Sequence, residues 1–442
     1  MPRPRVVVPV RTADGMLTVV AGHYGGCVDV ARSQDPPPVA GGRTSVEQHR
    51  ADVAQLLRPR LALGDRGVVT VPVEEAFGRV LAADVVARVA VPAFRNSQMD
   101  GFAVRSVDVT RPVRLPVSGE IAAGASPEPL VPGTAARIMT GAPVPDGADA
   151  VVPVEDTDVR RFCPGEIPAV VGLREPVDPG LFVREAGSDV AEGEVIVPAG
   201  TLVGPAHVAA IAACGARAVV LRQPRVAVIS TGSEVVSPAA ELGAGQVFDA
   251  NGPALAAAVR AAGAEVVGPF RVADAPQALG DLLDDVAARV DLILTSGGVS
   301  QGAYEVVKDL LRSAGEVEFR SVAMQPGGPQ GWGTYRGTPI LTFPGNPVSA
   351  QVSFVVLLRD ELLRTAGLPG RGTVRLPLAG ATTSPAGRRQ FLRGVRDGDA
   401  VRVVGGPGSH LVATMARADV LIDVPEDVTE LQAGDEVEVW PL

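Results

Sequence analysis

The chain has 442 residues, a length that predicts about three domains and that is sufficient to bury a sizeable core. Hydrophobic residues make up 46% and charged residues 20%, a balance typical of a globular protein. The net charge of −10 argues against a nucleic-acid partner, which would require a basic surface. No apolar run approaches the roughly 20 residues of a membrane span, so we expect no membrane association.

The number and spacing of the cysteine and histidine residues argue against further classes of protein. The three cysteines, Cys27, Cys163 and Cys214, are far apart, so they imply neither a disulfide framework nor a zinc knuckle. This usage favours a cytoplasmic protein, and the apolar stretch Val6–Val10 is too short for a signal peptide. The four histidines lack metal-ligand spacing, so any metal is expected to have oxygen ligands.

Changes in apolar periodicity and in Gly and Pro content divide the chain into segments. A helix is expected to start at Thr44–Ser45, a second near 73–85, and a third from Pro205 to Cys214, ending at Gly215. In chain order we expect a flexible N-terminal extension (1–43), a discontinuous N-terminal mixed α/β domain (44–106 and 184–222), an inserted β domain (107–183), an α/β domain (223–366) and a small C-terminal β-barrel or sandwich (367–442).

The α/β domain shows the strongest pattern, because near-continuous apolar strands alternate with helices. The expected strands are at 225–230, 264–270, 291–296 and 339–343. The expected helices that follow them are at 253–263, 275–290, 302–315 and 346–363. This alternation predicts a parallel, doubly wound sheet with helices on both faces.

Three loops follow strands of this sheet, at 230–234, 295–300 and 343–347. Ligands of open α/β sheets bind beyond the carboxyl ends of the strands. Glycine lets the backbone approach a ligand closely, and N–H groups at a helix start favour an anion. For any one loop, Gly and Pro could simply make a tight turn. Three such loops at one edge favour a ligand that carries a phosphate or another oxyanion.

Carboxylates surround these loops, and the residues concerned are Glu234, Asp249, Asp274 and Glu305. Oxygen ligands of this kind suit Mg²⁺ that bridges phosphates. Asp274 could instead cap the helix that follows it. Lysine and arginine together number 40, and Lys308 is the single lysine, one turn beyond Glu305. It is either a surface residue or one that reaches back to the anion, and its rarity favours the second reading.

From Thr44 to the C-terminus the chain resembles the MoeA family, whose eukaryotic relative is the gephyrin E domain. Each motif is moderately specific, and their joint order and spacing are highly specific. The segments that carry the resemblance are NSQMDGFAV (96–104), GEIAAG through VVPVED (119–156), VREAGSDV (183–190), STGSEV (230–235), FDANGP (248–253), TSGGVSQGAYEVVK (295–308), FPGNPVSA (343–350), RRQFLRG (388–394) and GSHL (408–411).

The resemblance implies a MogA-like α/β domain and a molybdopterin molybdotransferase of molybdenum cofactor biosynthesis. Such an enzyme inserts molybdate into adenylylated molybdopterin with Mg²⁺ and releases AMP. The resemblance also implies a homodimer, with a composite active site between the α/β domain and the first two domains of the other subunit. The upstream molybdopterin adenylyltransferase is a further expected partner.

Motif position assigns residues to this expected site. The expected catalytic residues are Asp100, Thr140, Glu234, Asp274, Glu305 and Lys308, with Asp100 and Thr140 crossing the dimer interface. The expected metal ligands are Glu234, Asp274 and Glu305. The expected residues for binding the nucleotide and pterin are Asp249, Asn251, Ser296, Gly297, Gly298, Ser300, Pro344, Gly345, Asn346 and Ser349.

One loop departs from the family pattern. After Met324, members usually carry lysines beside a Pro-Gly loop, whereas residues 325–330 here read QPGGPQ. Loss of one charged hydrogen bond weakens anion binding by roughly 10- to 150-fold, and Arg320 or Lys308 is a candidate to compensate. The alternative function is therefore a divergent paralogue that binds pterin, or an interaction module with weak catalysis.

Overall fold

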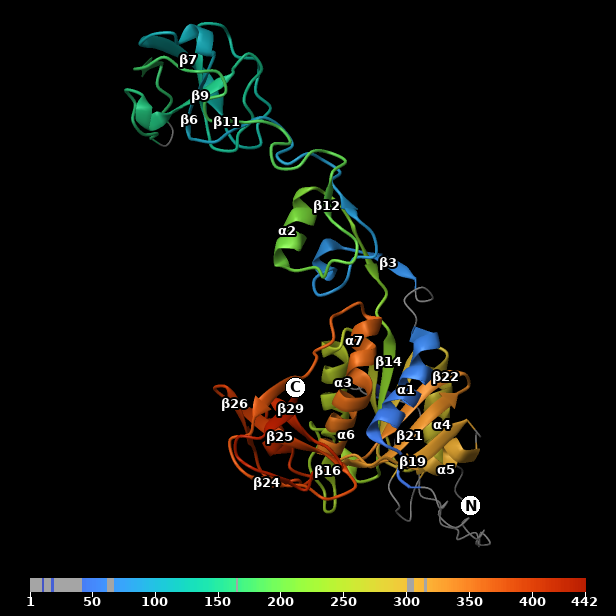
Figure 1. Cartoon of the computed structure of the whole chain (residues 1–442). Helices are drawn as coiled ribbons and strands as arrows, with labels where there is room; N and C mark the ends of the chain where they lie inside the picture. The colour runs from blue at the N-terminus through green and yellow to red at the C-terminus, as the bar shows by residue number, and fades with distance from the viewer. Residues whose placement is uncertain are drawn as a thin grey trace, which may run out of the picture. The chain divides into compact units, whose positions relative to one another are not determined.

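The computed structural model describes residues 10–11, 17–19, 42–61, 67–163, 166–299, 306–313 and 316–442 (Figure 1). These residues form two compact units: Met1–Val68 with Leu221–Leu442, and Val69–Val220. The expected extension at 1–43 lies largely outside the described residues. None of the helices described is long and apolar enough to cross a membrane.

The first unit is built on an eight-stranded sheet with the order β1-β2-β17-β14-β18-β22-β21-β19. Strand β14 runs parallel to β17 and β18, and β18 runs parallel to β22, as the sequence predicts. The strands are β1 (Val10–Arg11), β2 (Leu17–Val19), β14 (Arg225–Thr231), β17 (Glu265–Val272), β18 (Leu292–Ser296), β19 (Val317–Ser321), β21 (Pro329–Tyr335) and β22 (Thr338–Phe343).

Helices cover both faces of this sheet (Figure 1). One face carries α1 (Val46–Leu61), α3 (Asn251–Ala261), α6 (Pro347–Ser353), the π-helical turn η4 (Phe354–Leu358) and α7 (Arg359–Thr365). The other carries α4 (Pro276–Ala287) and α5 (Val306–Ser313). Successive side chains of β14 alternate between the two cores: Val228 belongs to the first and Ile229 to the second. The predicted doubly wound domain is therefore confirmed.

Two strands at one edge differ from the all-parallel expectation. Strand β21 is antiparallel to β22, and β19 is antiparallel to β21. Their glycines and Pro329 interrupt the apolar pattern, which is why the sequence did not predict them. A Cβ atom at Gly331 would lie 2.2 Å from Oγ1 of Thr342, and one at Gly333 would lie 2.1 Å from the carbonyl oxygen of Glu316. Glycine in these strands therefore allows close approach of neighbouring groups.

Helix α1 was expected within the N-terminal domain, but it packs on the α/β sheet. Its apolar residues Val53, Leu57 and Leu61 are buried in the core that also contains Leu294. The second expected helix, near 73–85, is wrong. Only a 3₁₀ turn, η1 (Val73–Glu75), forms there, because Gly78 adopts a positive φ of 73° that ends any helix.

Buried His49 on α1 makes the stability of this unit depend on pH. Its imidazole packs edge-on against Trp332, and burial, with nearby Arg320, lowers its pKa from 6.5 to about 4. As the pH falls below 6.5, His49 becomes protonated in the unfolded chain, whereas in the folded chain it stays neutral until the pH approaches 4. The contribution of neutral His49 is therefore fully present above pH 6.5, and the free energy of unfolding should fall by about 3 kcal/mol by pH 4.

We expect His49→Phe to remove this contribution to the pH slope. Both tryptophans of the chain, Trp332 and Trp440, lie in this unit, so tryptophan fluorescence during urea unfolding reports on it alone. The measurement compares the free energy of unfolding at pH 7 and pH 4.5 for the two proteins. Equal losses in wild type and variant would show that His49 does not cause the acid destabilisation.

The C-terminal part of the first unit is a small β structure, as predicted. Its sheet has the order β20-β25-β27-β29-β23, with β26 paired to β25, and a separate pair joins β24 to β28. The strands are β20 (Met324–Gln325), β23 (Val374–Pro377), β24 (Thr382–Thr383), β25 (Arg389–Asp397), β26 (Ala400–Val403), β27 (Val420–Val424), β28 (Glu430–Leu431) and β29 (Glu436–Pro441), and the short helix α8 (Val412–Met415) lies between β26 and β27. Because β20 comes from the chain segment just before β21, the loop between them links this sheet to the α/β sheet.

The second unit contains a five-stranded sheet with the order β10-β7-β8-β6-β9. It includes Gly101–Val104, so this sheet begins before the expected boundary at 107. Helix α2 (Pro205–Ala213) forms as predicted and packs near β12. The strands of this unit are β3 (Val68–Val71), β4 (Val85–Val86), β5 (Asn96–Ser97), β6 (Gly101–Val104), β7 (Val113–Ile121), β8 (Ala135–Ile138), β9 (Ala150–Pro153), β10 (Val170–Leu173), β11 (Val183–Arg184), β12 (Val195–Val197) and β13 (Ala218–Leu221), and its 3₁₀ turns are η1, η2 (Ser106–Asp108) and η3 (Val154–Asp156).

Candidate functional site

A cavity of about 590 Å³ lies beyond the carboxyl ends of β14, β18 and β22, where the sequence places the ligand. We call it the carboxylate pocket. All three predicted loops contribute to it, together with residues 247–251. Its polar and backbone lining includes Ser230, Thr231, Gly232, Glu234, Asp249, Asn251, Asp274, Gly297, Gly298, Pro344, Gly345, Asn346 and Ser349. Its size falls in the range of small-molecule sites.

Contacts at Gly297 and Gly345 hold the three loops against one another. The N–H of Gly297 donates to the carbonyl oxygen of Phe343 at 3.0 Å, and Nδ2 of Asn251 donates to the carbonyl oxygen of Gly345 at 2.7 Å. Gly297 has a φ of 97°, and a Cβ atom there would lie 2.6 Å from the carbonyl oxygen of Thr231. Only glycine can therefore bring the loop after β18 against the loop after β14.

Asp249 lines the carboxylate pocket, and one of its carboxylate oxygens has no hydrogen-bond partner among the described residues. It is 3% exposed, and its Oδ1 accepts the N–H of Gly252 at 2.9 Å at the start of α3. Oδ2 of Asp249 and the hydroxyl oxygen of Ser230 are buried and have no hydrogen-bond partner among the described residues. Buried polar atoms normally have partners, so these atoms indicate that a ligand or solvent completes the site.

Asp274 is tied to the loop after β14. Its Oδ2 accepts the N–H of Ser233 at 3.1 Å, and its own N–H donates to the Ser233 hydroxyl oxygen at 3.0 Å. The residue that caps α4 is Ala275, without a side-chain hydrogen bond, so Asp274 does not act as the helix cap. Glu234 is exposed on the same loop. Among the described residues lining the carboxylate pocket, the charged ones are all acidic: Glu234, Asp249 and Asp274.

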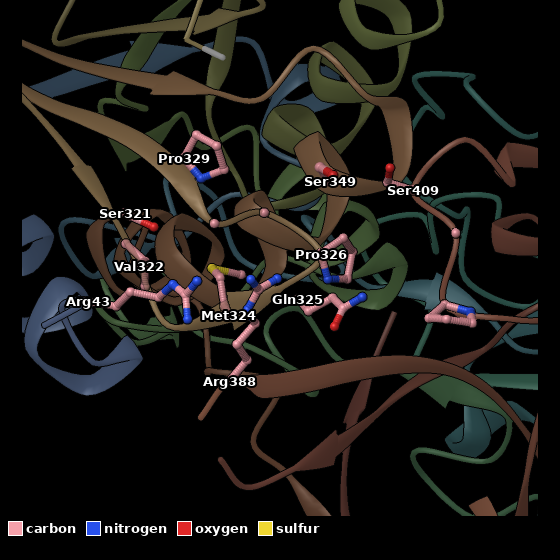
Figure 2. Close-up of a pocket in the computed structure, with 14 residues that line it drawn as sticks. Arg43, Ser321, Val322, Met324, Gln325, Pro326, Pro329, Ser349, Arg388 and Ser409 are labelled. Carbon is pink, nitrogen blue, oxygen red and sulfur yellow. The ribbon is translucent and has the colours of Figure 1, made fainter. Parts of the chain in front are cut away.

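A second cavity, of about 440 Å³, adjoins the first and shares Pro329 and Ser349 with it (Figure 2). We call it the arginine pocket. Its charged lining residues, within the described chain, are Arg43 and Arg388. Three hydroxyl groups and the loop without lysine complete its wall: Ser321, Ser349, Ser409 and residues 325–329. Two guanidinium groups and hydroxyl donors without a carboxylate suit an oxyanion.

A buried ion pair fixes one edge of the arginine pocket. Arg389 donates from Nε and Nη2 to the carboxylate of Asp423 at 2.7 and 2.6 Å, and Asp423 is 3% exposed. Nε1 of Trp440 donates to the same carboxylate at 2.9 Å. This pair anchors the start of β25 and thereby holds the preceding residue, Arg388, at the pocket wall.

Some predicted residues are not brought to either pocket. Ser296 is buried at the end of β18 and is not among the described residues that line them. Ser300 and Glu305 lie outside the described residues. Lys308 lies on α5 and is not among the described residues that line the two pockets. Arg320 forms ion pairs with Asp52 and Glu318 and stacks on a tryptophan ring, so it does not replace the missing lysine.

Of the charged and hydroxyl residues that line the arginine pocket, Ser349 was predicted from the sequence, whereas Arg43, Ser321, Arg388 and Ser409 were not. Arg43 was assigned to the N-terminal extension, while Arg388 and Ser409 were quoted only as parts of motifs. Their motif membership was the available signal for the last two. For Arg43 the sequence held no signal, because only the tertiary fold places it beside the loop of residues 325–329.

In the second unit the structure brings together the two predicted residues Asp100 and Thr140. Oδ1 of Asp100 accepts the backbone N–H of Thr140 at 2.7 Å and its hydroxyl at 2.9 Å. Both side chains are exposed, on loops that follow β5 and β8. The pair therefore presents a carboxylate of fixed orientation at the surface of this unit.

Three regions of a known protein family together match most of the chain. Residues 44–215 match the MoeA N-terminal region (domains I and II). Residues 227–364 match the probable molybdopterin binding domain, and 375–442 match the MoeA C-terminal region (domain IV). The chain belongs to the MoeA family, which confirms the resemblance seen in its motifs.

Individual relatives are similar along almost their whole length. A Mycobacterium tuberculosis protein named molybdopterin molybdenumtransferase 2 is 47% identical over 415 residues, covering 90% of this chain and 99% of the relative. Molybdopterin molybdenumtransferase 1 of the same organism is 38% identical over 431 residues, covering 89% and 98%. The solved structure of a molybdopterin biosynthesis MoeA protein from Pyrococcus horikosii has 33% identity and a TM-score of 0.68, covering 90% and 99%.

Proposed function

We propose that this protein acts in molybdenum cofactor biosynthesis as a molybdopterin molybdotransferase, which inserts molybdate into adenylylated molybdopterin and releases AMP. The observation that carries the proposal is the pair of adjoining pockets of opposite charge within a MoeA-family fold. Relatives covering most of the chain are named molybdopterin molybdenumtransferase, which supports the same reaction. The protein would act in the cytoplasm.

The carboxylate pocket fits a substrate whose phosphates are accompanied by Mg²⁺. A phosphate next to Glu234, Asp249 and Asp274 would be repelled unless a cation lay between them. Within the described residues, no three His, Cys, Asp or Glu side chains form a ready-made metal centre. Mg²⁺ commonly takes one or two carboxylates and completes its shell with water and phosphate oxygens. We assign Glu234 and Asp274 as its ligands, with Glu305 as the third predicted one.

The cation would balance charge on the phosphoanhydride while the bond to AMP is cleaved. The chain's own groups would hold the ends of the substrates. Gly297 and Gly298 allow the adenylyl phosphate to approach the backbone after β18, and the buried oxygens of Ser230 and Asp249 would bind polar groups of the ligand. Arg388, with hydroxyl groups beside it, would hold molybdate in the adjoining arginine pocket.

We further propose a homodimer in which Asp100 and Thr140 complete the site of the other subunit. Their hydrogen-bonded geometry supports a shared role, because the backbone and hydroxyl of Thr140 fix the Asp100 carboxylate. The catalytic role of Lys308 stays a prediction, because Lys308 is not among the described residues that line either pocket. The upstream molybdopterin adenylyltransferase would deliver the adenylylated substrate.

Asp100→Asn should reduce activity without reducing stability. The amide keeps an oxygen that can accept both hydrogen bonds from Thr140, but it removes a charge that is exposed and therefore contributes little to folding. We expect AMP release to fall by about 100-fold or more, with an unchanged melting temperature. If the variant released AMP at the wild-type rate, Asp100 would not be a catalytic residue.

Turnover with the natural substrates tests the function itself. Purified protein is incubated with adenylylated molybdopterin, Mg²⁺ and molybdate, and both AMP and molybdenum cofactor are quantified. The control is the double variant Asp100→Ala/Glu234→Ala. If wild-type AMP release does not exceed that of the control, the enzyme proposal fails and the alternative, a pterin-binding paralogue or interaction module, is favoured.

A further inference from the structure

The arginine pocket receives its two positive charges from distant parts of the chain. Arg388 precedes β25, whereas Arg43 precedes helix α1. Figure 2 shows both side chains extending toward the same part of the pocket, beside Met324. Within the part of the chain that the structure describes, neither guanidinium forms an ion pair with a carboxylate. Two like charges facing one cavity repel each other unless an anion lies between them.

The backbone fixes the position of Arg43. The N–H of Thr44 donates to the carbonyl oxygen of Ser321 at 3.1 Å, and the N–H of Ala323 donates to the carbonyl oxygen of Thr44 at 2.8 Å. Thr44 thus forms a parallel bridge with Val322, directly beside the pocket wall. Next in the chain, the Ser45 hydroxyl oxygen accepts the N–H of Gln48 at 3.1 Å and caps α1, whose apolar face is buried. Arg43 therefore directly precedes a residue that a strand bridge holds in place, and the start of α1 follows that bridge in the chain.

The loop of the arginine pocket cannot supply positive charge itself. Residues 325–329 read QPGGP, and Arg320 is occupied by Asp52 and Glu318. The remaining polar groups at the wall are neutral hydroxyls. A tetrahedral dianion such as molybdate carries two negative charges, which Arg388 alone would balance only in part.

We propose that Arg43 is a second oxyanion-binding residue of this pocket and supplies the charge that the loop lacks. This inference rests on the proposed function, since it names molybdate as the occupant. The guanidinium of Arg43 would donate hydrogen bonds to molybdate from the side opposite Arg388. Arg43 is then part of the binding site and raises its affinity for the oxyanion.

Direct binding of molybdate to the full-length protein, without pterin, tests the proposal. Isothermal titration is carried out on wild type, Arg43→Ala, Arg43→Lys, Arg388→Ala and the control Arg402→Ala, which alters an exposed arginine outside the pocket. We expect Arg43→Ala and Arg388→Ala each to weaken binding by about tenfold or more. Arg43→Lys should recover part of the loss because it keeps the charge, and Arg402→Ala should match wild type.

Turnover provides a second readout. Arg43→Ala should raise the KM for molybdate by about tenfold and leave the KM for adenylylated molybdopterin unchanged, because the two substrates contact different pockets. A merely structural residue would change both constants together.

The outcomes separate the two proposals. If Arg43→Ala binds molybdate as tightly as Arg402→Ala while Arg388→Ala is weakened, Arg43 has no role and the proposed function stands. If wild type binds no molybdate, or if neither arginine affects binding, the assignment of the pocket fails and Arg43 with it. AMP release by wild type then decides separately whether the enzyme proposal survives.

Discussion

The double variant Glu234→Gln/Asp274→Asn is expected to release AMP at least about 100-fold more slowly than wild type. Both substitutions keep the size of the side chain and remove its charge, so the carboxylate pocket loses two of its three described acids. Mg²⁺ would then be held only by the remaining groups and by the substrate. The measurement is AMP release in a single turnover over a range of Mg²⁺ concentrations.

The Mg²⁺ dependence distinguishes metal binding from a general loss of structure. Each single variant should require more Mg²⁺ for half-maximal rate, and added Mg²⁺ should restore part of its activity. The control is Glu241→Gln, an exposed acid close in sequence that does not line the pocket, and it should behave as wild type. Unchanged Mg²⁺ requirements in both single variants would exclude these carboxylates as metal ligands.

Gly297→Ala is expected to abolish nucleotide binding and to destabilise the first unit by about 2–4 kcal/mol. Alanine at a φ of 97° is strained, and its Cβ atom would lie 2.6 Å from the carbonyl oxygen of Thr231, which is backbone and cannot rotate away. The loops after β14 and β18 must therefore separate, and the hydrogen bond from Gly297 to Phe343 is lost with them. Urea unfolding followed by tryptophan fluorescence measures the stability.

A matched glycine separates strain from steric conflict. Gly398, in the same unit, also has a positive φ, of 61°, but no atom lies within 4 Å of the position that its Cβ would occupy. Gly398→Ala should therefore cost only about 1 kcal/mol and leave binding of AMP intact. Equal effects of the two substitutions would mean that backbone strain alone, and not the packing of the loops, explains the loss at Gly297.

The carboxylate pocket could be predicted because short stretches of neighbouring residues in the sequence mark each of its loops. Each of its loops follows an apolar strand, and parallel strands that alternate with helices must bring their carboxyl ends to one edge. Residues such as Glu234, Asp249 and Gly297 therefore fall together once the strand order is assumed. Asp100 and Thr140 were assigned to the site only through family motifs, and the hydrogen bonds between them were not predicted.

The arginine pocket could not be predicted, because several segments far apart in the sequence build it. Arg43, Ser321 and Arg388 meet only when Thr44 bridges to Val322 and β20 pairs with β25. Neither pairing has an apolar periodicity that marks it in sequence. The packing of α1 on the α/β sheet was missed for the same reason, since an amphipathic helix shows which residues are buried but not the surface that buries them.

The proposed function requires that an oxyanion occupies the arginine pocket beside a site for the phosphate-bearing substrate. Crystals of the full-length protein soaked in tungstate, a heavier analogue of molybdate, would locate the anion directly by its anomalous scattering. We expect one dominant peak between Arg43 and Arg388, within hydrogen-bond distance of Ser349 or Ser409. A dominant peak elsewhere, with this pocket empty at saturating tungstate, would contradict the account.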